Sequence, residues 1–186
     1  RPLETSIPLV VGAQVESTVA GELKSLAPSD AAVILFTSGT SGTPKGVVLS
    51  HGALQARVAL NIEHIGTDPL QRTLNLLPVH FGHGLIGNCL TPLACGGHLF
   101  LGREDCPGPA MRLGQTIDEN DITFMSSVPG IWKLALRMSP KPEKGTLKRV
   151  HIGSAPLSEA LWREISDWSG APVWNMYGLT ETSNWV

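Results

Sequence analysis

From Ser29 onward, short apolar runs alternate with longer amphipathic segments along the chain. The short runs are rich in β-branched residues, as strands are, and the longer segments repeat apolar residues every three or four positions, as helices do. Alternation of this kind implies crossover connections and predicts an α/β fold with a mostly parallel sheet and helices on both faces. The expected strands are 31–36, 47–49, 72–77, 97–101, 122–125, 147–153 and 172–176, and the expected helices are 50–65, 84–94, 109–119, 129–139 and 158–169.

The apolar spacing also predicts which helix faces are buried. Ser50 is expected to cap the first helix, because its hydroxyl can accept from a free N–H of the first turn. The segment 1–28 has three prolines and no sustained period, and it is expected to be an extended lead-in with one strand at 7–11. The residues expected to face the core are Ile131, Leu134, Ala135 and Met138 in one helix, and Leu157, Leu161, Ile165 and Trp168 in another. Tryptophans are expected in the core, except that Trp185 is expected to dock on further parts of the protein.

The segment 36–46, Phe-Thr-Ser-Gly-Thr-Ser-Gly-Thr-Pro-Lys-Gly, contains three glycines, five hydroxyl side chains and one lysine. Glycines bring backbone N–H groups close to a ligand, hydroxyls donate hydrogen bonds and the lysine adds a positive charge, so the segment suits a polyphosphate. It is not a P-loop of the NTPases, because Pro44 stands where that motif needs glycine and Gly46 follows Lys45. Apolar runs on both sides predict a loop that joins two strands of a hairpin. The alternative is a glycine- and serine-rich turn without a ligand.

Residues 37–46 resemble the phosphate loop of the adenylate-forming enzymes, the superfamily of acyl- and aryl-CoA ligases, peptide-synthetase adenylation domains and luciferases. Two further segments follow in the order of that family: 151–158, which resembles the segment bordering the adenine, and 175–181, which resembles the Tyr-Gly-x-Thr-Glu signature. A weaker match covers 77–85. The resemblance extends from about residue 29 to the end, which implies a lead-in at 1–28 and part of an AMP-binding (adenylation) domain at 29–186.

The resemblance implies ATP-dependent activation of a carboxylic acid to an acyl-adenylate, with release of pyrophosphate. Lys45, Thr180 and Glu181 are the expected catalytic residues, with Glu181 as the Mg²⁺ ligand. The residues expected to bind ATP are Thr37, Ser38, Gly39, Thr40, Ser41, Gly42, Thr43, Lys45, Gly153, Ser154, Ala155, Asn175, Tyr177, Gly178 and Thr180.

By the same resemblance, Phe81 and His83 are expected to lie beside the carboxylic acid. Peptide-synthetase domains that use α-amino acids carry an aspartate directly after the aromatic residue, and this chain has Gly82 there. A buried ammonium without its carboxylate is unfavourable, so a simple acyl or aryl acid is expected. Transfer to coenzyme A is the expected second step. A carrier-protein acceptor, and a module that binds ATP without turnover, are the alternatives.

Length and composition limit the remaining choices. The 186 residues fit one domain, and the net charge of −2 lacks the positive excess that is typical of proteins that bind nucleic acid. No apolar run is long enough to span a membrane, and the sequence from Arg1 on shows no signal peptide. Three cysteines without a Cys-x-x-Cys pair indicate reduced thiols, so a cytoplasmic location is expected. The family continues beyond its Thr-Glu signature with an acidic residue that holds the ribose and a small domain whose lysine reaches the α-phosphate. No segment matches either, so the chain is expected to be a fragment that lacks the C-terminal part, does not complete the reaction alone and exposes apolar surface that favours self-association.

Overall fold

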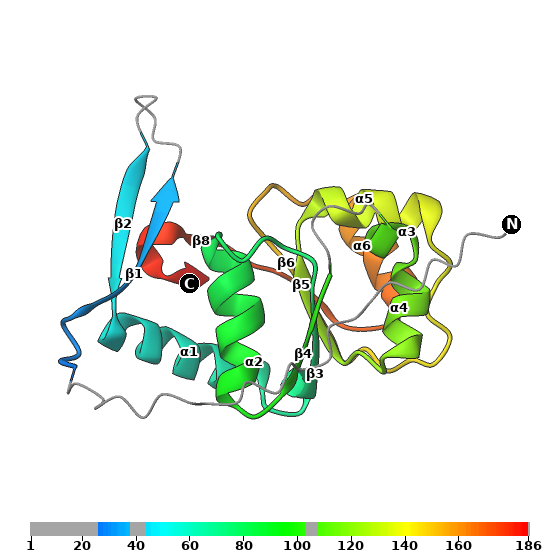
Figure 1. The fold of residues 1–186 in the computed structure, drawn as a ribbon. Helices are drawn as coiled ribbons and strands as arrows, with labels where there is room; N and C mark the ends of the chain where they lie inside the picture. Colours follow the sequence, from blue (N-terminus) through cyan, green and yellow to red (C-terminus); the bar gives the residue numbers. More distant parts are fainter. Residues whose placement is uncertain (1–25, 38–43, 103–107, 186) are drawn as a thin grey trace, which may run out of the picture.

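The computed structural model describes residues 26–37, 44–102 and 108–185 (Figure 1). The lead-in strand expected at 7–11 lies outside these residues. The elements follow one another as β1 (Ala31–Thr37), β2 (Lys45–Ser50), α1 (His51–Ile65), the 3₁₀ turn η1 (Pro69–Gln71), β3 (Arg72–Asn75), the π-helix η2 (His83–Leu90), α2 (Thr91–Ala94), β4 (His98–Leu101), α3 (Gly108–Met111), α4 (Leu113–Glu119), β5 (Phe124–Ser127), α5 (Pro129–Met138), β6 (Arg149–Ile152), α6 (Glu159–Ser169), β7 (Val173–Asn175), β8 (Gly178–Leu179), the 3₁₀ turn η3 (Thr180–Thr182) and β9 (Asn184–Trp185).

The predicted parallel sheet is confirmed. Five strands pair in the order β4-β3-β5-β6-β7, and each neighbouring pair is parallel. Figure 1 shows α3 to α6 on one side of this sheet, and α1, η2 and α2 on the other. Because all five strands run the same way, their carboxyl ends share one edge, where ligands of open α/β sheets bind. We call this edge the rim.

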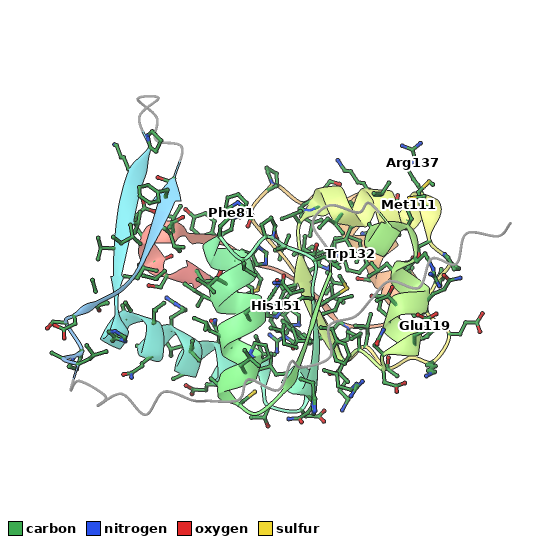
Figure 2. The ribbon with its side chains drawn as sticks, in the orientation of Figure 1. Phe81, Met111, Glu119, Trp132, Arg137 and His151 are labelled. Atoms are coloured by element: carbon green, nitrogen blue, oxygen red, sulfur yellow. The ribbon has the colours of Figure 1, made fainter. Side chains whose placement is uncertain are left out.

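Alternate residues of each strand enter different cores, as the two-residue period of a strand requires. On β6, Val150 and Ile152 pack in the larger cluster beneath α3 to α6, together with the buried ring of Trp132. His151, between them, lies on the opposite face, where Phe124 contacts it edge-to-face. Figure 2 labels Trp132 beside α5 and His151 on the side of α1 and α2. The sheet is therefore covered on both faces.

Serine caps begin two of the helices. The Ser50 hydroxyl accepts from the backbone N–H of Ala53 at 3.2 Å, as predicted from the sequence. The Ser158 hydroxyl accepts from the N–H of Leu161 at 3.3 Å, and α6 ends at Gly170, which takes the left-handed conformation with φ 65°. These caps fix where the chain turns after β2 and before β7.

The helix expected at 84–94 begins with eight residues of π-helix, η2. Two polar side chains support its wide turn: the hydroxyl of Thr91 donates to the Ile86 carbonyl at 2.7 Å and accepts from Asn61 Nδ2 at 3.1 Å. Glycine is required at position 84, because a β-carbon there would lie 2.3 Å from the Pro78 carbonyl oxygen. π-Helical turns are rare and are frequently found at functional sites, so an eight-residue π-helix marks this region as a candidate functional site.

Strands β1 and β2 form the predicted antiparallel hairpin, which is separate from the five-stranded parallel sheet (Figure 1). Its inner face contributes Leu35 and Leu49 to a small core with Ile86. Its outer face leaves Ile34, Phe36 and Val48 largely exposed.

Four details of the prediction were wrong, and the first is the face of α5. The buried face of α5 carries Pro129, Trp132 and Ala135, whereas Leu134 and Met138 are exposed and Ile131 is only partly buried. The helix turns its large indole inward because Trp132 buries more apolar area than any residue of the predicted stripe, and it packs edge-to-face on Trp168 at 5.6 Å between ring centroids.

The other three concern Trp185, the segment 109–119 and two further tryptophans. Trp185 is buried in this chain's own core with Ile65, Leu70 and Phe124, so it does not depend on further parts of the protein for its burial. The segment 109–119 forms two short helices, α3 and α4, in place of one. The core expectation also fails for Trp162 and Trp174, which are partly exposed.

In the described part of the chain, no helix has both the length and the apolar character needed to cross a membrane. Cys89 and Cys95 carry free thiols, and Cys106 lies outside the described residues.

Candidate functional site

The base of the predicted phosphate loop is the open end of the β1–β2 hairpin. Thr37 and Lys45 face each other there, and the Thr37 hydroxyl donates to the Lys45 carbonyl at 3.5 Å. Lys45 is exposed. The structure therefore places the first and last ligand candidates of the loop side by side. The six candidates between them lie outside the described residues: Ser38, Gly39, Thr40, Ser41, Gly42 and Thr43.

The Thr-Glu signature sits on a small hairpin of its own. Gly178 in β8 pairs with Trp185 in β9, and a β-carbon at Gly178 would lie 2.1 Å from the Asn184 carbonyl oxygen, so only glycine fits. The Thr182 hydroxyl accepts from the Leu179 N–H at 3.1 Å and donates to its carbonyl at 2.9 Å, which closes the turn η3.

This turn packs against β2, so Thr180 and Glu181 lie beside the strand that begins at Lys45 (Figure 1). Glu181 is exposed and Thr180 is partly buried. Strand β2, which begins at Lys45, and the turn that carries Glu181 are thereby packed together although they lie more than a hundred residues apart in the chain.

The predicted adenine segment follows β6 at the rim. Gly153 is buried, and a β-carbon there would lie 3.1 Å from the Met176 carbonyl oxygen, which joins this segment to the residue before Tyr177. Tyr177 is 70% exposed. Ser154, Ala155 and Asn175 are also exposed. Ser154, Ala155 and Tyr177, which are predicted to border a planar base, are therefore open to solvent on two segments that meet at Gly153 and Met176.

The two candidates for the acid site behave differently. Phe81 is 53% exposed, lies just before η2 (Figure 2) and stacks at a tilt on His80, with ring centroids 4.4 Å apart. His83, the first residue of η2, is buried and engages both ring nitrogens. Its Nδ1 lies 2.8 Å from the Ser154 hydroxyl, and its Nε2 lies 2.6 Å from the Ser126 hydroxyl. Burial lowers the pKa of His83 to about 4, so the imidazole is neutral at physiological pH.

Polar residues beneath the rim were missed by the sequence reasoning. Asn88 Nδ2 donates to Asn75 Oδ1 at 3.0 Å and to the Ser126 carbonyl at 2.8 Å, and Asn75 Oδ1 also accepts from the Leu77 N–H at 2.9 Å. The signal available was a polar residue at the carboxyl end of a buried strand: Asn75 ends β3, and Ser126 lies near the end of β5. These bonds pin η2 to the rim.

Glu181 is the candidate for binding a metal. Within the described ranges no group of three or more histidine, cysteine or acidic side chains gathers around one point. A site with a single carboxylate suits Mg²⁺, which takes one or two carboxylates and completes its shell with phosphate oxygens and water.

Comparison with known proteins places the chain in a family. Residues 6–186 match the family model described as AMP-binding enzyme. The 4-chlorobenzoate–CoA ligase of Arthrobacter sp is 28% identical over 177 residues, a match that covers 93% of this chain and 33% of that protein. The L-proline–[L-prolyl-carrier protein] ligase of Streptomyces coelicolor is 32% identical over 167 residues and is matched over 31% of its length, with 87% of this chain covered.

Among solved structures, ATP-bound MatB from Rhodopseudomonas palustris matches with a TM-score of 0.73 at 29% identity, over 86% of this chain and 31% of that one. The chain thus spans about a third of the length of these relatives. Because the family model covers nearly all of its residues, the chain belongs to the family of AMP-binding enzymes.

Proposed function

We propose that this chain is the nucleotide-binding part of a longer ligase that activates a carboxylic acid with ATP. The observation that carries the proposal is the convergence of the predicted segments: η3 packs against β2, Gly153 meets Met176, and Ser154 bonds to His83. In this proposal residues 29–186 are part of the adenylation domain, and 1–28 lead into it.

The reaction joins two anions. A carboxylate oxygen attacks the α-phosphorus of ATP, the bond from that phosphorus to the bridging oxygen breaks, and pyrophosphate leaves with its electron pair. Alignment and charge neutralisation are therefore the main tasks of the site. Lys45 and Thr37, with the loop between them, are assigned to the β- and γ-phosphates, and Thr180 to the α-phosphate.

Glu181 is assigned to Mg²⁺. Its exposed carboxylate stands on a closed turn next to Thr180, so a phosphate held by the threonine lies within reach of the same cation. When bound, the metal supplies positive charge to the phosphate oxygens. The chain's own contribution is to fix the carboxylate through the Thr182 bonds that hold η3.

Adenine is assigned to the exposed face formed by Tyr177 and the segment 153–155. Small residues leave room for a planar base, and an aromatic ring stacks on it. Asn175, at the end of β7, offers both a donor and an acceptor beside that face.

The acid is assigned to the Phe81 segment, and coenzyme A to the second step. A β-carbon at Gly82 would lie 3.3 Å from Leu35 Cδ1 and 3.9 Å from Ile86 Cδ1, so the described atoms that it would contact are apolar, unlike a carboxylate that could pair with an ammonium group. One relative is named as a CoA ligase of an aryl acid and another as a carrier-protein ligase of an amino acid, so a carrier protein is the second candidate acceptor.

The test is acid-dependent exchange of pyrophosphate into ATP by the full-length enzyme, across aliphatic, aryl and amino acids. Exchange with any carboxylic acid supports adenylation, and coenzyme A or a carrier protein is then added to identify the acceptor. ATP binding without exchange for every acid would identify a module without turnover and refute the proposal.

The same panel tests the substrate class. Because Gly82 stands where an aspartate would pair with the ammonium, we expect α-amino acids to be at least about tenfold poorer in kcat/KM than their deaminated analogues. Matched pairs such as phenylalanine and 3-phenylpropanoate isolate the ammonium group. Faster exchange with the amino acid of such a pair contradicts this expectation.

A further inference from the structure

His83 joins three elements beneath the rim. It belongs to η2, while its ring bonds to Ser126 at the end of β5 and to Ser154 in the loop after β6. A neutral imidazole has one donor nitrogen and one acceptor nitrogen, so one serine donates to the ring and the other accepts from it. Both bonds are made at once only in one position of the ring relative to the two serines.

The ring is itself held in place. Asn88 donates to the carbonyl of Ser126, and Asn75 Nδ2 approaches the carbonyl of Gly84 at 3.4 Å, one residue after His83. Trp185 packs edge-to-face on the imidazole, with 5.4 Å between centroids. These contacts therefore fix the position of the His83 ring, and Ser154 is the exposed residue that is hydrogen-bonded to it.

Ser154 adopts a backbone conformation that is uncommon for a residue with a β-carbon. Its φ is 64°, in the left-handed region. Such residues persist only where their surroundings hold them, and they gather at functional sites. Of the four non-glycine residues with positive φ in the described part of the chain, Ser154, Ser183 and Asn184 belong to the rim segments. The bond from His83 is the contact that holds the Ser154 side chain.

We propose that His83 is a positioning residue that fixes Ser154 in the left-handed conformation and thereby shapes the segment 153–155 into the surface against which adenine binds. This inference rests on the proposed function. It assigns His83 to the nucleotide through Ser154, in place of the direct contact with the acid expected from the sequence. A β-carbon on Gly153 would lie 3.6 Å from His83 Cε1, so the imidazole also supports the residue before the serine.

A pair of substitutions at Ser154 separates backbone conformation from the loss of a hydroxyl. Ser154→Ala removes the bond and leaves a β-carbon that disfavours the left-handed region. Ser154→Gly removes the same bond, but glycine takes that conformation freely. In the full-length enzyme we expect Ser154→Ala to raise the KM for ATP about tenfold and Ser154→Gly about threefold, with the KM for the acid changed less than twofold in both.

A second pair tests which nitrogen matters. His83→Asn keeps a polar atom near the position of Nδ1, and His83→Gln keeps one near the position of Nε2. We expect His83→Gln to behave like Ser154→Ala, and His83→Asn to stay closer to the wild type. Ser126→Ala is the matched control, since it removes the other bond of the same ring and is expected to change the KM for ATP less than Ser154→Ala does.

The combination of His83→Gln with Ser154→Gly closes the cycle. If His83 acts through the conformation of Ser154, the double variant matches Ser154→Gly. The proposal is overturned if adding His83→Gln to Ser154→Gly raises the KM for ATP as much as adding it to the wild type does. It is also overturned if Ser154→Ala raises the KM values for ATP and for the acid equally. The dissociation constant of AMP, measured by calorimetry in the same variants, gives the same ranking without turnover, so an enzyme without exchange activity defeats the proposed function and leaves this test intact.

Discussion

At the scale of single residues, the site divides into side chains that meet solvent and side chains that hold them. Lys45, Tyr177 and Glu181 are exposed, whereas His83 and Asn75 are buried beneath the rim. Exposed polar groups contribute little to folding, and buried ones with several hydrogen bonds contribute more. The two groups therefore predict different consequences for substitution.

Lys45→Ala or Glu181→Gln is expected to lower acid-dependent pyrophosphate exchange by about 10- to 100-fold, the equivalent of one charge-assisted hydrogen bond of about 1.5–3 kcal/mol. The melting temperature should change by less than about 2 °C, because both side chains are exposed. Lys133→Ala and Glu164→Gln, on the exposed faces of α5 and α6, serve as matched controls with unchanged exchange. Full activity in either rim variant removes that residue from the proposed mechanism.

His83 predicts a dependence of stability on pH. Burial lowers its pKa from 6.5 to about 4, so between these values the unfolded chain binds more protons than the folded one. The free energy of unfolding therefore falls as the pH is lowered from 7 toward 4, and the share due to His83 at pH 4.5 is about 2 kcal/mol.

Urea unfolding of the full-length enzyme at pH 7 and pH 4.5 measures this share, with His83→Gln as the comparison. The variant should lose about 2 kcal/mol less than the wild type over that interval. The titratable neighbour is His151, whose pKa is lowered to about 2 by burial first and then by the charge of Arg149. His83 is itself a minor cause of this shift, but the larger cause, burial, remains in the variant, so folded His151 stays neutral at pH 4.5 in both proteins and its contribution largely cancels. If the wild type and His83→Gln lose the same unfolding free energy between pH 7 and pH 4.5, His83 does not stay neutral in the folded state.

At the scale of elements, periodicity was enough to place most of the helices and strands, the parallel sheet and the hairpin that carries the phosphate loop. It was not enough for η2, because six of its eight residues are buried and the segment has no apolar stripe whose period could distinguish a π-helix from an α-helix. Nor did it fix the face of α5, where Trp132 outweighs a regular stripe of smaller residues. The β8–β9 hairpin has two residues in each strand, too few for any period to show.

For the site, the sequence predicted the exposed candidate residues but not the buried hydrogen bonds beneath them. Motif resemblance gave the exposed candidates at the rim, since these residues carry the chemistry directly. The hydrogen bonds of Ser126, Asn75 and Asn88 depend on contacts between segments far apart in the chain, and spacing along the sequence carries no trace of such contacts.

The close contact between η2 and β9 gives a prediction at this scale. A β-carbon at Gly87 would lie 2.7 Å from Asn184 Nδ2 and 2.8 Å from the Trp185 ring. Gly87→Ala should therefore push β9 away and lower the free energy of unfolding by about 1–3 kcal/mol, as overpacking does.

Gly130→Ala is the control, because a β-carbon at that position in α5 meets nothing within 4 Å and alanine favours a helix. Chemical unfolding of both variants is the measurement. Loss of stability in the Gly130 variant equal to that in the Gly87 variant would show that the contact with β9 is not the cause.

At the scale of the whole molecule, the parallel sheet brings separate motifs to one rim. The segments after β3, β6 and β7 reach the same edge because all three strands point there. The hairpin β1–β2 reaches that region through β2, which lies beside η3. The fold therefore explains why motifs spread over more than 140 residues, from Thr37 to Glu181, can serve one nucleotide.

This arrangement also sets a limit on the chain by itself. The chain spans about a third of the length of the two ligases and the solved structure compared above. Electrostatic catalysis needs all of its donors in place at once, and by the resemblance two of them, an acidic residue and a lysine, are expected outside these 186 residues. We expect the 186-residue chain to bind AMP weakly through the rim, and to form AMP from ATP and acid at least about 10³-fold more slowly than the full-length enzyme.

The measurement is acid-dependent AMP formation with ATP, Mg²⁺ and coenzyme A, by the purified chain and by the full-length enzyme at equal concentration. Far-UV circular dichroism confirms that the chain is folded, and AMP binding that is lost in Tyr177→Ala shows that the rim is intact. If the folded chain then turns over slowly, the rim binds the nucleotide and the rest of the enzyme supplies the remaining donors. If it turns over as fast as the full-length enzyme, the rim residues are sufficient for the chemistry, and the division of labour proposed between this chain and the rest of the enzyme is wrong.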